Sequence, residues 1–381
     1  MQQLLARGDK DSPFTKFYVD DSTGRLVVDP HAGAPGLYVG QTGVSDAALL
    51  AALTADRATG RVSFPNGAEF PNGLLLPSVG MHNRIINGNF EIWQRGYNFT
   101  AVPGGVYTAD RWICYPGGGL GSVSANKAAP TSGFTGSTVF SAQGNGAPVG
   151  GQIHLVQRFE GQTMADIAGH DAMLSFDISA SSSAGSISGV VYAHTNSALD
   201  NGTYANLCTY TPFDIPAGVS RIEIPIAGAA IQNFGLGGQI GILITQNSAP
   251  GNISLTIGAV QFERGPVANP FEYRHSAIEW ALCERYFQRI TGWGGGWQWG
   301  AEQLAVAGSF RTIMAHTPTV IIIDGTLGAE QFGWSFQNIL SIHGASMTPE
   351  GGIISFITTA CNQGSLGGIS YVSKIYASAE L

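Results

Sequence analysis

Arg84-Ile-Ile-Asn-Gly-Asn-Phe-Glu-Ile-Trp-Gln-Arg-Gly96 and Gly258-Ala-Val-Gln-Phe-Glu-Arg-Gly-Pro-Val-Ala-Asn-Pro-Phe-Glu-Tyr-Arg274 mark the two ends of the region that decides the fold. Between them, several segments alternate apolar with polar residues, as half-buried antiparallel strands do. Clusters of Gly, Ser, Asn and Pro separate these segments. Strands of this length and spacing predict a two-sheet β-sandwich. The candidate strands are residues 152–159, 172–178, 189–194, 221–226, 239–245 and 252–257.

The composition of the chain also indicates an all-β protein. Its 381 residues suffice for two or three domains with buried cores. Charged residues make up 12% of the chain, about half the usual share, and the 53 glycines are about twice the usual share. Because 44% of the residues are hydrophobic, the low charge does not indicate disorder. Glycine supplies the positive φ angles of tight turns, so we expect many short strands joined by such turns.

The charge balance disfavours two classes of partner. There are 18 basic and 26 acidic residues, for a net charge of −8, and no Lys/Arg cluster, so we expect no nucleic acid partner. An acidic surface also disfavours anionic membranes. Residues 224–244 carry no charge, but Pro225 and several polar residues favour two buried strands with a turn at Gln232-Asn233 over a membrane span. Residues 1–10 lack the apolar core of a signal peptide, so we expect synthesis in the cytoplasm.

The segment before the sandwich, residues 1–80, has short and irregular patterns. Weak alternation at 16–20 and 25–29 predicts a small hairpin, and residues 45–57 carry a capped helical pattern. No core within a single chain is apparent. We interpret residues 1–80 as an attachment and oligomerisation segment, with a loosely packed arm as the equal alternative.

The sandwich is expected to cover residues 84–275. After it, the spacing of apolar residues first becomes that of a helix and then returns to that of strands. Ser276-Ala-Ile-Glu279 forms a capping box, and Ile278, Leu282 and Tyr286 follow on one stripe, which predicts a connecting helix over residues 276–290. Residues 291–381 predict a C-terminal β domain. Its strand patterns lie at 319–324, 352–358 and 371–381.

Several separate segments together resemble a known family. They are residues 87–93, 107–112, 257–263, 270–274, 310–320 and 376–381. In this order they are similar to the carbohydrate-binding-module-like jelly roll, and the domain after it, of bacteriophage and prophage tail-fibre or receptor-binding (spike) proteins. The resemblance implies that residues 87–93 form the opening strand and that residues 257–263 form a return strand paired with it. It also implies that Phe90 and Trp112 belong to the core and that Asn87-Gly88 is a turn.

The resemblance implies an adhesive part of a virion. The expected protein is a non-catalytic, homotrimeric fibre or spike that adsorbs to the surface polysaccharide of a host cell. Residues 1–80 would hold other virion proteins, and the chain would be made in the cytoplasm of the host bacterium. Two alternatives stay open: a structural head fibre or tail decoration protein that binds only virion proteins, and a polysaccharide depolymerase.

Candidate glycan-binding residues are aromatic, because sugars present apolar C–H faces that stack on rings while flanking amides bond hydroxyl groups. The richest segment is Trp293-Gly-Gly-Gly-Trp-Gln-Trp299, with Trp293, Trp297 and Trp299. Trp297 and Trp299 share one strand face, so a core or subunit interface is the alternative. Tyr192, His194 and Tyr204 are weaker candidates on sandwich loops.

No metal, cofactor or catalytic motif stands out. The resemblance implies a calcium ion where the first and last strands meet, for which Glu91 and Glu263 are weak candidates. The alternative is that both glutamates are solvated or bonded to backbone. The eight histidines form no H-x-x-H pattern, and the four cysteines show no metal spacing and are expected to be buried free thiols. Glu160, Asp166, Asp171 and Asp177 lie near each other in the sequence, but nothing singles out a glycosidase pair.

Overall fold

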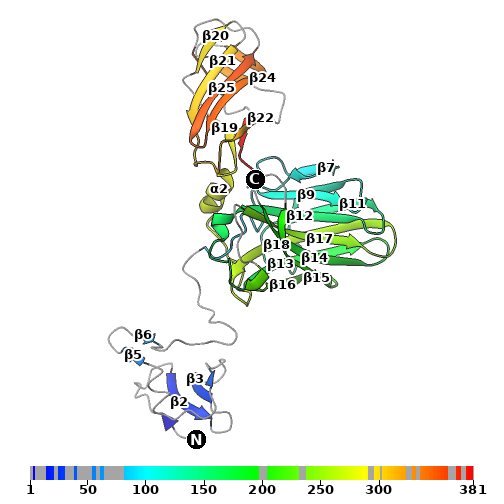
Figure 1. The fold of residues 1–381 in the computed structure, drawn as a ribbon, viewed down its shortest axis with the longest axis vertical. Coiled ribbons are helices and arrows are strands. Elements are labelled where there is room, and N and C mark those ends of the chain that lie inside the picture. The colour runs from blue at the N-terminus through cyan, green and yellow to red at the C-terminus, as the bar shows by residue number, and fades with distance from the viewer. Residues whose placement is uncertain are drawn as a thin grey trace. The chain divides into compact units, whose positions relative to one another are not determined.

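A computed structural model gives the fold (Figure 1). It describes the backbone of residues 3–4, 14–20, 25–30, 38–40, 54–56, 61–63, 81–196, 204–230, 237–290, 296–300, 303–322, 328–331, 335–358, 366–369 and 375–380. Side chains are described for residues 81–195, 209–228, 230, 237–290, 305–321, 341–356 and 375–380. The chain divides into two compact units, Met1–Pro71 and Asn72–Leu381.

The first unit contains short antiparallel strands. The expected hairpin is confirmed, because Phe14–Asp20 (β2) pairs with Arg25–Pro30 (β3). The helix expected over residues 45–57 is wrong at its end, where Thr54–Asp56 (β5) pairs as a strand with Arg61–Ser63 (β6). The rest of that expected helix lies outside the described residues. Gln3–Leu4 (β1) and Tyr38–Gly40 (β4) complete a sheet of order β1-β2-β3-β4.

The second unit contains the β-sandwich, built from two six-stranded antiparallel sheets (Figure 1). Sheet I has the order β16-β13-β18-β11-β10-β7, and sheet II has the order β15-β14-β17-β12-β9-β8. All six candidate strands lie within observed strands, so the all-β sandwich is confirmed. In sheet I the strands are Asn98–Val102 (β7), Val123–Ala128 (β10), Val139–Ala147 (β11), Ala172–Ser182 (β13), Ser220–Ile226 (β16) and Gly251–Arg264 (β18). In sheet II they are Val106–Tyr107 (β8), Trp112–Gly117 (β9), Gln152–Glu160 (β12), Ile187–Asn196 (β14), Tyr204–Phe213 (β15) and Gly237–Gln246 (β17).

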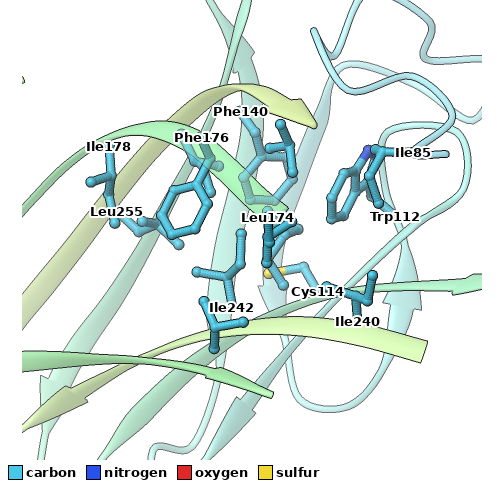
Figure 2. Packing of buried hydrophobic residues seen from close by; sticks show 14 of the residues in the cluster. Ile85, Trp112, Cys114, Phe140, Leu174, Phe176, Ile178, Ile240, Ile242 and Leu255 are labelled. Atoms are coloured by element: carbon cyan, nitrogen blue, oxygen red, sulfur yellow. The ribbon is translucent and has the colours of Figure 1, made fainter. Parts of the chain in front are cut away.

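The sandwich core lies between the two sheets. Figure 2 shows Trp112, Cys114, Ile240 and Ile242 of sheet II close to Phe140, Leu174, Phe176, Ile178 and Leu255 of sheet I. Phe90 and Trp112 are buried in this core with ring centroids 5.0 Å apart, as expected. The uncharged segment around residues 224–244 contributes β16 and the buried β17, whereas its expected turn at Gln232-Asn233 lies outside the described residues.

The expected opening strand over residues 87–93 is wrong, because this segment is a turn. Asn87 and Phe90 have φ angles of 56° and 55°, and two left-handed residues this close together turn the chain away from an extended course. The Asn87 side chain holds the turn, since its amide donates to the carbonyl oxygen of Ile92 at 2.8 Å and accepts from the backbone N–H of Ile92 at 3.0 Å. The expected return strand is part of β18, which pairs with β11 and β13 instead of residues 87–93. Val260 N–H of β18 bonds to the carbonyl oxygen of Gly88 at 2.8 Å.

The connecting helix, Ser276–Glu284 (α2), is shorter than expected and is capped differently. His275 is the N-cap, and its Nδ1 accepts from the backbone N–H of Ala277 at 3.2 Å. Glu279 does not complete the expected capping box, because its carboxylate accepts from the Arg274 guanidinium and from the backbone N–H of Asn87. No helix in the described part of the chain is long and apolar enough to cross a membrane.

The expected apolar stripe is confirmed only in part. Tyr286 and Cys283 are buried, whereas Ile278 is 45% exposed. After the helix, the carbonyl oxygen of Tyr286 accepts a hydrogen bond from Ala379 N–H, and the residues that follow Tyr286 pair with Ile375–Ser378 (β27) in a sheet. Phe287–Ile290 (β19) is therefore a strand, although a helix was expected up to residue 290.

The remaining strands form a small sheet and a closed barrel. The sheet has the order β19-β27-β22, with Ile375–Ser378 (β27) and Thr319–Ile322 (β22). β22 lies within the strand pattern at 319–324, and its Ile321 is 37% exposed. A second hydrophobic cluster, which includes Val306 and Phe356, forms the core of this region. The barrel strands are Gly296–Gly300 (β20), Gln303–Ser309 (β21), Gly328–Gln331 (β23), Ser335–Thr348 (β24), Gly351–Thr358 (β25) and Leu366–Ile369 (β26).

Candidate functional site

The face of sheet II that points away from the core carries an unusual set of aromatic rings, and we call it the outer face. Paired residues of an antiparallel sheet point to the same side, so the strand register shows which side chains are neighbours. One cross-strand row begins with Tyr210 of β15, Tyr192 of β14 and Gly241 of β17, and ends with Val156, Ile113 and Tyr107. The next row contains Val190, Leu243, His154 and Tyr115.

Three rings of the outer face contact one another directly. His154 stacks on Tyr115 with ring centroids 4.4 Å apart and an interplanar angle of 13°. The hydroxyl of Tyr192 lies 3.1 Å from the hydroxyl of Tyr115 and 3.3 Å from Nδ1 of His154. His194 meets the Tyr192 ring edge-on at 5.4 Å. The result is a continuous row of rings, in which the polar atoms of Tyr115, His154 and Tyr192 bond to each other.

A glycine allows Tyr192 to lie flat on the sheet. A Cβ atom at Gly241, its cross-strand neighbour, would lie 2.1 Å from a ring carbon of Tyr192. Apolar side chains lie around this ring and fix its position. They form a small cluster on the outer face, namely Ile113, Val156, Val190, Tyr192 and Leu243.

The imidazoles of the outer face are uncharged at neutral pH. Burial lowers the pKa of His154 to about 4. Burial also lowers the pKa of His194. Tyr192 is only 6% exposed, whereas Tyr210 beside it is 57% exposed. The face therefore offers an open ring at Tyr210 next to a fixed, uncharged network of hydroxyl and imidazole groups.

The residues expected to bind glycans separate into two groups. Tyr192 and His194 lie in β14 and belong to the outer face, although both were expected on loops. Tyr204 lies in β15 of the same sheet, and its side chain is outside the described residues. Trp297 and Trp299 lie in β20 of the barrel, also with side chains outside the described part, and Trp293 lies outside it altogether.

Sequence reasoning missed Tyr115, His154 and Tyr210. Each occupies an outward position of its own strand, and the alternation of each strand carries that signal. Their meeting depends on the order β15-β14-β17-β12-β9, which no pattern within one strand reveals.

The two glutamates considered for calcium have protein partners. Glu263 is fully buried, and its carboxylate accepts from the backbone and side-chain nitrogen atoms of Asn269 at 2.8 and 2.6 Å. It also accepts from Nε2 of Gln261 at 2.8 Å. Glu91 accepts from the Ser137 hydroxyl at 2.8 Å. Within the described residues, no three His, Cys, Asp or Glu side chains are grouped in a way that would hold a metal ion.

The four acidic residues that lie near each other in the sequence have separate partners. Glu160 pairs with Arg285 at 3.0 Å, and Asp166 pairs with Arg84 at 2.5 Å. Asp171 accepts from Gly228 N–H at 2.8 Å, and Asp177 pairs with Arg221 at 3.1 Å. Each carboxylate therefore already has a hydrogen-bonded partner in the protein. Of the cysteines, Cys114 and Cys283 are buried free thiols.

Comparison with known proteins gives structural likeness only. No family model matches the chain, and no curated protein matches it. TmCBM61, solved in complex with β-1,4-galactotriose, is 12% identical, with a TM-score of 0.29, over 48% of this chain and 99% of its own.

Two further solved structures are comparably similar. A structure described for carbohydrate-binding modules of the β-sandwich superfamily is 10% identical, with a TM-score of 0.30, over 62% of this chain and 72% of its own. A cyclase from Fischerella sp. TAU, in complex with 4-(1H-indol-3-yl)butan-2-one, is 13% identical, with a TM-score of 0.34, over 50% of this chain and 100% of its own. At these identities and TM-scores the likeness does not extend to a ligand or an activity.

Proposed function

We propose that the protein is a non-catalytic adhesin that binds glycans through the outer face of sheet II. The row formed by Tyr115, His154 and Tyr192, with the exposed ring of Tyr210 beside it, supports this proposal. A ring offers a flat apolar surface to the C–H face of a sugar, and the tyrosine hydroxyl both donates and accepts hydrogen bonds. Neutral imidazoles suit the same task, because each has one donor and one acceptor nitrogen atom.

The biological setting proposed here is a virion. The segments that resemble phage fibre and spike proteins support this setting, in which the sandwich adsorbs to host surface polysaccharide. Residues 1–80 would attach the chain to other virion proteins, and three copies would form the fibre. Light scattering on the full chain tests the trimer, and a monomer in solution contradicts it.

Binding of the full chain to host cells and to their extracted surface polysaccharides tests the adhesin. Tyr210→Ala removes the exposed ring of the outer face, and His154→Ala removes the central imidazole. Tyr273→Ala is a matched control, because Tyr273 is also 57% exposed but lies outside sheet II. We expect about tenfold weaker binding for each outer-face variant and unchanged binding for the control, since one aromatic contact contributes about 0.5–1.5 kcal/mol.

Three other results would each change the proposal. If Trp297→Ala/Trp299→Ala alone abolishes binding, the site lies in the barrel and the outer face is structural. If no host material binds, the chain is better explained as a head fibre or tail decoration protein. Release of reducing sugar from host capsule by the purified chain would show a depolymerase and overturn the non-catalytic assignment.

A further inference from the structure

Sheet II carries far less charge than sheet I. Among Asp, Glu, Lys and Arg, its six strands contain two residues, Arg158 and Glu160, which both lie near the end of β12. The six strands of sheet I contain six, namely Lys127, Asp177, Arg221, Glu223, Glu263 and Arg264. The low charge of the whole chain therefore does not by itself account for the low charge of sheet II.

The two rows that hold the rings of the outer face contain no charged residue. Arg158 lies beyond both rows, two residues along β12 from Val156, and it bounds the face at one end. Glu160 lies still further along, and its carboxylate accepts from Arg285 at 3.0 Å and from the Tyr286 hydroxyl at 2.6 Å. The strands at the centre of the outer face therefore offer a ligand neither a cation nor an anion.

The polar groups that flank the rings are neutral as well. A third cross-strand row contains Gln152 of β12, Thr245 of β17 and Ser188 of β14. Oε1 of Gln152 lies 3.0 Å from Nε2 of His154, so this row continues the polar network of the rings. Amides and hydroxyl groups donate and accept hydrogen bonds, and they suit the hydroxyl groups of a sugar. A carboxylate that moved onto this face would lose its water without gaining a cation, and that loss is costly.

The open rings of the outer face are far apart. Tyr210 is 57% exposed in β15, and Tyr115 is half-buried in β9. Because β14, β17 and β12 lie between these two strands, four strand intervals of about 4.8 Å, or about 19 Å in all, separate them. A single sugar ring is much shorter than this span. A ligand that contacts both rings is therefore a run of several sugars that crosses the strands.

We infer that the outer face binds a run of several uncharged sugars and disfavours acidic polysaccharides. The choice of a sugar rests on the proposed function, and the choice of an uncharged class rests on the charges of sheet II. Ring contacts and hydrogen bonds between neutral groups hold this ligand. Its affinity should therefore not depend on ion pairs.

Surface polysaccharide extracted from the host, separated by anion exchange into uncharged and acidic fractions, tests this inference. Calorimetric titration of the full chain measures the affinity for each fraction at about 50 mM and about 500 mM sodium chloride, because salt weakens ion pairs between exposed groups. Arg158→Gln removes the cation at the end of the face, and Tyr210→Ala removes the exposed ring. Partial hydrolysis of the uncharged fraction supplies disaccharides and hexasaccharides of the same composition.

We expect the uncharged fraction to bind with the same affinity at both salt concentrations and in Arg158→Gln, and about tenfold more weakly in Tyr210→Ala. Hexasaccharides should bind about tenfold more tightly than disaccharides, because only the longer ligand reaches both rings. Binding confined to the acidic fraction, an affinity that falls about tenfold at high salt, or a loss of affinity in Arg158→Gln overturns the uncharged class. Equal affinity of disaccharides and hexasaccharides overturns the run of several sugars.

The proposed function and the class of sugar fail in different ways. If neither fraction binds, the adhesin itself is wrong, and the class of sugar falls with it. If only the acidic fraction binds and Tyr210→Ala weakens that binding, the adhesin stands and only the uncharged class is wrong.

Discussion

Replacing Glu380 by Gln should destabilise the protein far more than an ordinary surface substitution. The Glu380 carboxylate follows β27 and is only 4% exposed. It pairs with Arg111, which is fully buried, and with Arg95 at 3.1 Å. Burial alone disfavours the charged form of Arg111, but Glu380 and Tyr286 outweigh it and raise the pKa of Arg111 above its ordinary value. The glutamine keeps the size of the side chain but leaves the buried guanidinium without its counter-ion.

The expected loss follows from burial. Removing one partner of a buried ion pair costs about 3–5 kcal/mol, because the other charge stays buried and uncompensated. Glu284→Gln is the matched control, since its partner Arg311 is 54% exposed, and exposed pairs contribute about 0–1 kcal/mol. The two variants make the same chemical change in different surroundings.

Guanidinium chloride unfolding of the full chain, followed by tryptophan fluorescence, measures both losses. The free energy of unfolding should fall by several times more in Glu380→Gln than in Glu284→Gln. An equal and small loss would show that water reaches Arg111 in the folded protein. The contact of Arg95 and Arg111 of the sandwich unit with Glu380 after β27, together with the hydrogen bonds around Asn87 and Asp110, is called the joint. The joint would then be a solvated surface contact, and the reasoning from burial would be refuted.

Two further variants test the outer face and the joint. Gly241→Val places a Cβ atom 2.1 Å from a ring carbon of Tyr192, so it should displace the ring. We expect the free energy of unfolding to fall by about 1–3 kcal/mol and glycan binding to weaken. Equal binding by a correctly folded variant would remove Tyr192 from the site. Burial raises the pKa of Asp110 from 3.8 to about 6, so the folded state holds the proton more tightly than the unfolded state. The stability that Asp110 contributes is thus complete below pH 3.8 and is lost as the pH rises to about 6. Over this window wild type should lose up to about 3 kcal/mol relative to Asp110→Asn, as measured by unfolding at each pH, and parallel pH profiles would contradict this.

Local patterns predicted the strands and the core, because alternation decides which side chains a strand buries. Residues 152–159 show this, with Ile153 and Leu155 in the core and His154 outside it. The same reasoning failed for residues 87–93. Their apolar residues suggest a strand, but the Asn87 side chain bonds to its own neighbours and favours a left-handed turn.

The outer face could not be predicted from one strand at a time. Tyr115 and Tyr210 lie in β9 and β15, and the strands β12, β17 and β14 separate them in the sheet. Only the order of the strands, together with the register of each pair, brings their side chains to one surface. Sequence reasoning selected Tyr192 and His194 as aromatic residues. Alternation places His154 on the outside of its strand, but only the register shows that it lies beside Tyr115 and Tyr192.

Asn87 and Asp110, which lie in segments that resemble phage fibres, contribute to the joint. Asn87 and Asp110 are fully buried, and the Asn87 amide donates to the carbonyl oxygen of Asp110 at 3.1 Å. Gln94 donates to the carbonyl oxygen of Phe287 at 2.7 Å, which ties the turn to β19. Such buried polar groups need these specific partners, so their side chains are tightly constrained. Outer-face residues such as Tyr210 are not constrained in this way. A chain can therefore keep the joint while the residues of the outer face change, so the residues of the joint do not determine the chemistry of that face.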